Sequence, residues 1–429
     1  MYGPLYFMLK FLYMLKFPKD FFWGAATSSH QIEGGNNNDW SVWEKANAER
    51  LAKEAKNKWQ DWQKGKFPEM LNSENYISGR VCDHYNRFQE DFDIAKSLGH
   101  NTHRFSLEWS RIEPEEGKFD EKEIEHYRQI IRALRERNIE PFVTLWHWPF
   151  PLWLAKKDGF KSKKIIKYFS RYAEKVGSAL KDDVKFWLTI NEPMVYSGNS
   201  FFKGVWPPGE KNLFSYLKVL MNLIWVHRRA YRTLKKINPD FQIGLAKNNI
   251  YFEAYKNRPL NYFLKKCADF WWNFLFLNKT WLYLDFIGLN YYFHNRIRNL
   301  KFNQNENKEL TDLGWEIYPE GIYHVLKDLK RYKRPVYITE NGLADAEDSR
   351  REKFIKEHLA WIHKAIGEGI DVRGYFYWSL LDNFEWDKGF WPKFGLVEVD
   401  AKTLERKIRP SAYEYAKICK SNELVIISN

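Results

Sequence analysis

The sequence VKFWL at residues 184–188, followed by TINEP at 189–193, decides the fold that we predict. The first run is mostly apolar and typical of a buried parallel strand, whereas the second is polar and contains Glu192. The pattern recurs where PVYI at 335–338 is followed by TENG at 339–342, which contains Glu340. Because α/β enzymes carry out their chemistry at the carboxyl ends of parallel strands, we expect both glutamates at one mouth of a sheet or barrel.

Two glutamates at one mouth match the requirements of glycoside hydrolysis. One carboxylic acid protonates the leaving oxygen, and one carboxylate attacks the sugar or activates water. A lone glutamate at a strand end is more often structural, in an ion pair or a helix cap. The recurrence of the same strand-and-carboxylate pattern favours chemistry for Glu192 and Glu340.

Strand and helix patterns alternate along most of the chain. Eight strands followed by helices and joined by right-handed crossovers predict an α/β fold, a single (β/α)8 TIM barrel with its catalytic loops at the C-terminal face. The predicted strands are residues 21–29, 101–109, 141–148, 184–188, 241–246, 285–292, 335–338 and 372–379, and the predicted helices are residues 83–98, 120–138, 162–180, 214–237, 261–276, 319–332, 350–368 and 410–419. A doubly wound open sheet is the alternative, but no Gly-rich phosphate loop follows the first strand.

One long stretch, residues 36–81, does not follow this alternation. It is polar, rich in lysine and without a clear period, so we predict a long loop whose tryptophans pack on the barrel face. We expect two parts in the chain: an apolar N-terminal arm at residues 1–16 and the barrel domain at residues 17–429.

The charge of the chain is strongly positive, with a formal net charge of +13 over 429 residues. Bases and acids are interleaved along the predicted helices, as in EKE at 121–123 and RREK at 350–353. Interleaving indicates a solvated charged surface, so no nucleic-acid partner is expected. Abundant Lys, Arg and Glu also fit a protein from a hot environment, and we expect a thermophilic prokaryote as its source.

The cysteines and the first residues bear on the cellular compartment. Cys82, Cys267 and Cys419 have no metal-ligand or redox spacing, which favours a reducing cytoplasm. The apolar arm is interrupted by Lys10, is too short to span a bilayer and lacks the features of a secretory signal. Three interpretations remain open for it: a start assigned upstream of Met14, a structural arm, or an interfacial membrane anchor.

Several motifs resemble those of glycoside hydrolase family 1, the β-glucosidase and β-galactosidase family, and the resemblance spans about residues 17–416. FFWGAATSSHQIEGG at 21–35 is similar to the family's N-terminal signature, TINEP to its acid/base motif and ITENG at 338–342 to its nucleophile motif. The resemblance implies a retaining mechanism with Glu340 as nucleophile and Glu192 as acid/base, on a small-molecule β-glycoside and with no metal or organic cofactor. Carboxyl groups about 5 to 5.5 Å apart would suit retention.

The resemblance also implies roles for neighbouring residues. Arg104 and Tyr292 are expected to pair with Glu340 and keep its pKa low, while the nearby negative charge raises the pKa of Glu192. The implied substrate-binding residues are Gln31, His147, Trp148 and Asn191 for the sugar hydroxyls, Trp378, Glu385 and Trp386 for stacking and the far hydroxyls, and Trp315 beside the aglycone site. The bond from Asn191 to the 2-hydroxyl can strengthen in the transition state.

The chain departs from the family pattern at three places. Phe293 stands where Thr or Ser is usual, Lys393 stands where Arg is common, and residues 273–284 form an unusually short and aromatic segment. Two interpretations of that segment remain open. It either makes the aglycone entrance more open and apolar, which favours aryl or alkyl aglycones, or it merely covers the barrel.

Two other functions compete with β-glycoside hydrolysis. A 6-phospho-β-glycosidase resembles the chain at both glutamates, but Glu385 would repel a phosphate dianion. A non-catalytic sugar- or lipid-binding relative would be expected to lose one catalytic glutamate, and this chain keeps both. Glucosides, galactosides, mannosides and fucosides are all compatible with the polar residues named above, and the sequence indicates no oligomeric state.

Overall fold

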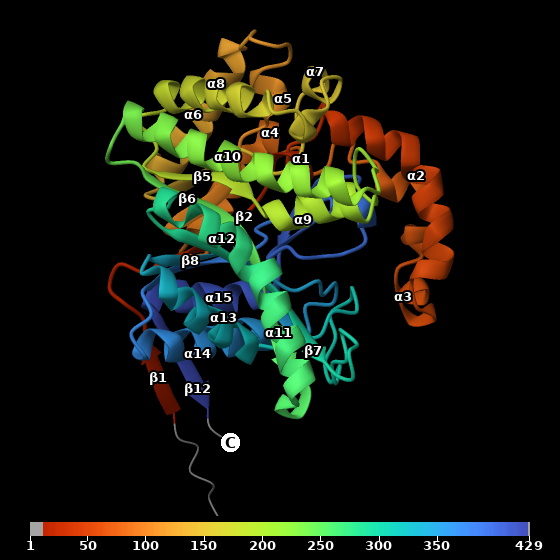
Figure 1. Ribbon diagram of the computed structural model, residues 1–429. Coiled ribbons are helices and arrows are strands. Elements are labelled where there is room, and N and C mark those ends of the chain that lie inside the picture. Colours follow the sequence, from red (N-terminus) through yellow and green to blue (C-terminus); the bar gives the residue numbers. More distant parts are fainter. Residues whose placement is uncertain (1–11, 428–429) are drawn as a thin grey trace, which may run out of the picture.

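The computed structural model describes residues 12–427 and has a closed barrel of parallel strands at its centre (Figure 1). The strands follow one another around the barrel in chain order, from β2 to β9, and β9 closes against β2. They are β2 (Phe22–Ala26), β3 (Thr102–Ser106), β4 (Glu140–Thr144), β5 (Phe186–Asn191), β6 (Gln242–Ala254), β7 (Ile287–Ile297), β8 (Val336–Asn341) and β9 (Val372–Trp378). The predicted (β/α)8 barrel is confirmed.

A ring of helices surrounds the barrel (Figure 1). Most of them bury an apolar stripe, as on α6, where the predicted face from Ile124 to Leu134 is at most 2% exposed. The main helices are α4 (His84–Ser97), α6 (Glu121–Glu136), α8 (Ile165–Ala179), α10 (Leu213–Ile237), α11 (Pro259–Ala268), α12 (Leu275–Thr280), α13 (Glu320–Leu329), α14 (Arg351–Gly367) and α15 (Pro410–Ser421). The helix predicted at 261–276 is divided, because the π-helical segment η6 (Asp269–Phe274) separates α11 from α12.

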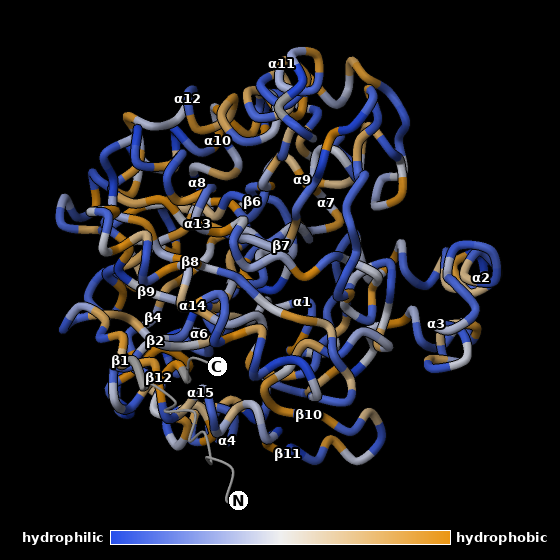
Figure 2. The backbone as a smooth tube through the Cα atoms, turned by 90° about the horizontal axis from the view of Figure 1, so that it is seen from below, coloured by the Kyte–Doolittle hydropathy of each residue, from blue (hydrophilic) through white to orange (hydrophobic). Residues whose placement is uncertain are grey.

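The prediction of a long loop at residues 36–81 was wrong. The segment contains α2 (Asp39–Lys58) and α3 (Asp61–Lys66), which project from one side of the barrel (Figures 1 and 2). Its buried stripe, Ala48, Leu51, Ala52 and Ala55, has helical spacing but consists mainly of alanine, which the surrounding lysines and glutamates obscure. Asn38 caps the start of α2 with a capping box. Its side-chain oxygen accepts from the backbone N–H of Ser41, and the Ser41 hydroxyl accepts from the backbone N–H of Asn38.

The strand ends also differ from the prediction in ways that shape the site. The first strand stops at Ala26, and the short helix α1 (Ser29–Ile32) follows with Gln31 on it. Strand β6 continues to Ala254 beside β7, well beyond the predicted end at residue 246. The two extended strands raise one side of the barrel mouth above the rest.

The first and last strands of the described residues pair with each other outside the barrel. Strand β1 (Leu12–Lys16), the last part of the expected arm, pairs antiparallel with β12 (Glu423–Ile427) (Figure 1). Residues 1–11 lie outside the described residues, and the membrane-anchor interpretation concerns them, so the division at residue 16 stays a prediction. In the described part of the chain, no helix combines the length and the apolar character needed to cross a membrane.

Aromatic side chains fill the lower interior of the barrel. The rings of Phe142 and Phe186 stack with their centroids 4.2 Å apart, and Phe376 and Tyr337 pack edge-on against Phe142. Bulky side chains in layers make the interior of such a barrel a packed core. Polar side chains therefore meet only above this plug, at the carboxyl ends of the strands.

The cap of α2 gives a first test. The Asn38 amide also donates to Glu108 at 3.2 Å and contacts His30 at 3.1 Å, both of which are buried. We expect Asn38→Ala to lower the free energy of unfolding by about 2–3 kcal/mol, from the lost cap and the buried partners that it leaves unpaired. The matched change Asp120→Ala, at the N-cap of α6, should cost only about 1 kcal/mol. Equal losses in urea titrations would contradict this account.

Candidate active site

The two sequence-predicted glutamates face each other across the barrel mouth from β5 and β8. Glu192 directly follows β5 and Glu340 lies in β8, and both are about 5% exposed or less. Glu340 accepts a hydrogen bond from Arg104 Nη1 at 2.5 Å and one from the Tyr292 hydroxyl at 2.9 Å. The expected partners of Glu340 are therefore in contact with it.

Glu192 is held by two amides that sequence analysis missed. Asn290 Nδ2 donates to Glu192 Oε1 at 2.8 Å and Asn248 Nδ2 donates to the same oxygen at 3.2 Å. The available signal was the position of both asparagines at the ends of apolar strand runs. Thr339 in turn donates to Asn290 Oδ1 at 2.7 Å, so that one amide links the strand of Glu340 to the Glu192 carboxyl.

The charge environment separates the two carboxyl groups. Burial, and then the charge of Glu340, raise the pKa of Glu192 to about 8. Burial also raises the pKa of Glu340, but Arg104 opposes this with its charge and hydrogen bond. The low pKa that we expected for Glu340 is thus incorrect, since burial outweighs the guanidinium. The guanidinium contacts Glu340 and not Glu192, and it favours Glu340 as the carboxyl that ionises first.

A chain of polar contacts connects Arg104 to the predicted sugar-binding residues. Arg104 Nη2 donates to Asn191 Oδ1 at 2.8 Å, and Asn191 Nδ2 lies 2.9 Å from His147 Nε2. Trp148 Nε1 donates to the Asn191 carbonyl at 3.0 Å. Burial and the charge of Arg104 hold the pKa of His147 well below its usual value, so this imidazole is neutral. Its buried Nδ1 has no hydrogen-bond partner within residues 12–427.

A second polar corner lies after β9. Gln31 Nε2 donates to Glu385 Oε2 at 3.3 Å and to the Phe384 carbonyl at 2.9 Å. Burial raises the pKa of Glu385 to about 8, and Lys388 opposes this rise. The indole of Trp386 packs 4.6 Å from that of Trp148, which gives this corner a rigid aromatic wall.

These residues surround a cavity of about 760 Å³. Nine of the sequence-predicted residues line it: His147, Trp148, Glu192, Tyr292, Trp315, Glu340, Trp378, Glu385 and Trp386. Gln31, Arg104 and Asn191 lie behind this lining and contact it through the hydrogen bonds above. The outer wall was missed by sequence analysis except for its general aromatic character, and it contains Phe202, Leu213, Tyr216, Ile250, Trp271, Trp272 and Phe293.

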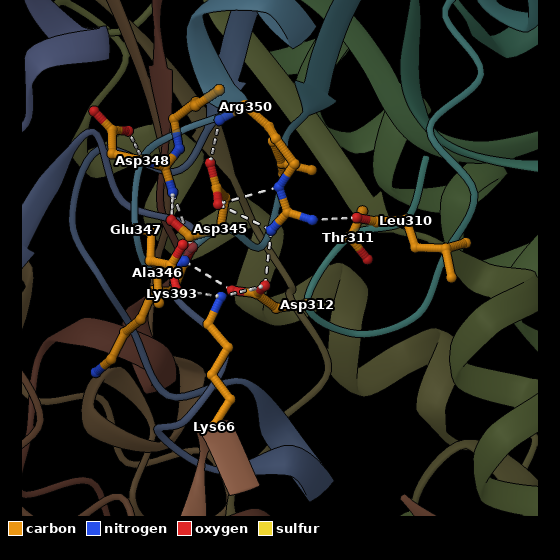
Figure 3. A network of polar contacts seen from close by, with 12 residues as sticks. Lys66, Leu310, Thr311, Asp312, Asp345, Ala346, Glu347, Asp348, Arg350 and Lys393 are labelled. Atoms are coloured by element: carbon orange, nitrogen blue, oxygen red, sulfur yellow. Dashed lines mark hydrogen bonds and ion pairs between the residues drawn. The ribbon is translucent and has the colours of Figure 1, made fainter. Parts of the chain in front are cut away.

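A network of ion pairs fixes the loop that carries Trp315 (Figure 3). Arg350 contacts Asp312 at 2.7 Å and Asp345 at 2.9 Å, and Lys66 of α3 contacts Asp312 at 3.1 Å. The backbone N–H of Ala346 also donates to Asp312 at 2.8 Å. Asp312 thereby joins the Trp315 loop to the segment that follows Glu340.

One buried cation lies beside the acid. Lys247, on β6, is 1% exposed, and its Nζ donates to the Asn248 carbonyl at 2.5 Å and lies 5.5 Å from the centre of the Trp272 ring. Burial lowers the pKa of Lys247 to about 7, and the charge of Glu192 opposes this. Its positive charge in turn lowers the pKa of Glu192. Among the described residues, no cluster of three or more His, Cys, Asp or Glu could hold a metal ion.

Comparison with known proteins places this geometry in a family. The family model described as Glycosyl hydrolase family 1 matches residues 13–281 and 276–424. The 1,4-beta-D-glucan glucohydrolase of Thermotoga neapolitana is 34% identical over 96% of this chain and 100% of its own length, and Beta-glucosidase A of Acetivibrio thermocellus is 34% identical over 95% and 99%. The solved structure of a beta-glycosidase from Pyrococcus horikoshii is 40% identical, covers 96% of both chains and has a TM-score of 0.85. The chain therefore belongs to glycosyl hydrolase family 1.

Proposed function

We propose that this protein is a retaining β-glycosidase that hydrolyses terminal non-reducing β-D-glucosides, and related β-glycosides, through a covalent glycosyl-enzyme. The observation that carries the proposal is the asymmetry of the two carboxyl groups: Arg104 and Tyr292 bind Glu340, whereas Glu192 has only amide partners and a pKa near 8. The names of its thermophilic relatives support glucosides as substrates.

In the first step, Glu192 is the acid and Glu340 the nucleophile. Ionised Glu340 attacks the anomeric carbon, the bond from that carbon to the aglycone oxygen breaks, and Glu192 gives its proton to that oxygen. A pKa near 8 keeps Glu192 protonated at neutral pH. Arg104 stabilises the ionised form of Glu340 until the new ester bond forms.

In the second step, Glu192 becomes the base. Ester formation removes the negative charge of Glu340, which is the largest neighbouring charge that raises the pKa of Glu192. Glu192, which has already given its proton to the aglycone, stays ionised and accepts a proton from water, whose oxygen attacks the anomeric carbon and releases Glu340. The sugar leaves with its original β configuration because it has been inverted twice.

The inner cavity supplies the contacts for the sugar. His147 and Glu385 line the inner part of the cavity beside the indoles of Trp148, Trp378 and Trp386. Polar groups fix the hydroxyls and flat aromatic faces cover the C–H faces of a pyranose. Asn191, oriented by Arg104, is placed to bind the 2-hydroxyl. At this corner Lys388 is already paired with Asp387 at 2.5 Å, which leaves its charge less available to a 6-phosphate.

The outer cavity favours apolar aglycones. Phe202, Leu213 and Trp271 line it and are 54%, 53% and 40% exposed, so an aglycone can cover apolar surface that water now reaches. Phe293, in place of a hydroxyl-bearing residue, packs 4.7 Å from Trp315 and extends the apolar wall. An alkyl or aryl aglycone therefore gains from burial at each added carbon.

Leaving-group chemistry separates the roles of the two glutamates. Glu192→Gln should lower kcat/KM by about 10²- to 10⁴-fold on octyl β-glucoside, which needs an acid, but far less on dinitrophenyl β-glucoside, which leaves as a stable anion. Glu340→Gln should lose activity on both substrates. Proton NMR should detect the β anomer as the first product.

Three results would contradict these assignments. They are equal losses on both substrates for Glu192→Gln, the α anomer as the first product, or preferential turnover of nitrophenyl β-glucoside 6-phosphate over nitrophenyl β-glucoside. The last would favour the 6-phospho-β-glycosidase.

Lys247 should make only a small contribution to the alkaline limit of activity. Protonated Glu192 is required in the first step, so the alkaline limb of the kcat/KM profile follows its pKa, which is about 8. The pKa of Lys247 is about 7, so this amine is mostly neutral where Glu192 titrates, and Lys247→Met should move the limb to higher pH by only a fraction of a pH unit. Lys203→Met, in the wall of the same cavity, is the control, because the charges that act on Lys203 are Lys388, Asp387 and Lys58. A shift of a full pH unit or more in Lys247→Met would contradict this account.

Substrate chain length tests the outer cavity. Along methyl, butyl, hexyl and octyl β-glucosides, kcat/KM should rise by up to about fourfold per methylene until the wall is covered. The double variant Phe202→Ser with Leu213→Ser should flatten the slope, whereas Leu71→Ser, an exposed leucine that does not line the cavity, should leave it unchanged. A flat series for the unmodified protein would refute the aglycone preference.

A further inference from the structure

Exposed apolar side chains are concentrated on one side of the protein. Of 22 large hydrophobic residues that are exposed in the described part of the chain, 14 lie between residues 202 and 282. Isolated exposed hydrophobic residues are normal on soluble proteins, whereas a gathered set indicates an interaction surface.

Four helical segments carry this surface. On α10, Phe214, Leu217, Met221 and Trp225 follow one another at helical spacing and are 82%, 37%, 48% and 46% exposed. The others are Leu260, Tyr262 and Phe263 on α11, Phe270 and Trp271 on η6, and Trp281 and Leu282 on η7 (Trp281–Tyr283). We call these eleven residues the apolar face.

The segments of the apolar face lie on the same side of the molecule. The rings of Tyr216 on α10 and Trp271 on η6 are 6.2 Å apart, and Arg232 on α10 donates to the Tyr283 hydroxyl on η7 at 2.6 Å. Figure 1 shows α10, α12 and α11 together at the front of the view. The segments of the apolar face therefore lie on one side of the molecule.

Positive charge is concentrated in the same part of the chain. Residues 211–284 contain 13 lysines and arginines and three acidic residues, which accounts for ten of the net thirteen positive charges. The helix α10 has no acidic residue, and its outer stripe passes from Phe214 and Trp225 to the exposed Arg229, Arg232 and Lys236. In this segment the basic residues lie beside exposed apolar side chains.

We propose that the apolar face seats on an anionic lipid bilayer. Aliphatic and aromatic side chains beside lysine and arginine match the acyl boundary and the anionic headgroups of such a surface. A second copy of the chain would set the same positive charge against itself. A nucleic acid could pair its phosphates with the lysines and arginines and stack its bases on the aromatic rings. It offers no apolar phase that would cover Leu217, Met221, Leu260 and Leu282.

The position of the cavity supports a bilayer as the occupant. Leu213, at the start of α10, and Trp271 belong to the exposed apolar surface and also line the cavity. The mouth of the cavity thus opens at the edge of the apolar face. A glycoside with a lipid aglycone could pass from the bilayer to Glu192 without crossing water, but the binding itself does not depend on the aglycone preference proposed above.

Sedimentation of the full chain with vesicles tests the proposal. The Glu340→Gln variant should sediment with phosphatidylglycerol vesicles, more weakly with phosphatidylcholine vesicles, and less with either at high salt. Two variants should each lower the partition coefficient at least about tenfold. The first removes apolar side chains and is the triple variant Phe214→Ser, Phe263→Ser, Leu282→Ser, and the second reverses charge and is the double variant Arg229→Glu, Lys266→Glu. All five side chains are exposed, so these changes leave the core intact.

Matched changes on other faces provide the controls. Two control variants should leave the partition coefficient unchanged. One is the triple variant Leu71→Ser, Leu300→Ser, Tyr413→Ser, and the other is the double variant Lys353→Glu, Lys407→Glu. Every variant keeps residues 1–11, so a contribution from the N-terminal arm is common to all. The proposal is overturned if the chain stays in the supernatant with both lipids or if the controls lose as much binding as the face variants. It is also overturned if the triple variant only dissociates a dimer seen by light scattering.

Discussion

The buried ion pair between Arg104 and Glu340 is the contact on which the rest of the site depends. Arg104 is fully buried and reaches Glu340, the Thr339 carbonyl, Asn191 and Thr144 from one guanidinium. Removal of one partner of such a pair leaves an unpaired buried charge and typically costs about 3–5 kcal/mol. The barrel supplies the partners of Arg104 because β3, β4, β5 and β8 all end at its mouth, above a plug of phenylalanine rings.

The same pair determines how the two carboxyl groups differ. Burial raises the pKa of both, so burial alone gives each the same tendency to be protonated. A cation bound to one carboxyl breaks this equivalence, and the charge that it stabilises on Glu340 raises the pKa of Glu192 further. Asn290 and Asn248 donate hydrogen bonds to Glu192 without adding charge, and the charge of Lys247 lowers the pKa of Glu192.

The fold and the inner site could be predicted from sequence because their signals are local and repeated. Apolar strands that end in Glu192 and Glu340 indicate a barrel mouth, and the family motifs assign most of the inner lining. The helix α2 was missed because a stripe of alanines gives a weak periodic signal among lysines. Asn248, Asn290 and Lys247 were missed because their importance comes from contacts with Glu192 across strands, which spacing along one strand does not reveal.

The aromatic residues of this chain serve three different physical purposes. Phe142 and Phe186 fill the barrel, Trp148 and Trp386 shape the sugar pocket, and Trp225 and Phe263 remain in contact with solvent. The first two uses follow from burial and are common to any barrel with a carbohydrate pocket. The third is costly in water unless another surface covers it. Because the cost falls on a strongly basic part of the chain, next to the mouth of the cavity, the physical argument favours a bilayer as the surface that removes it.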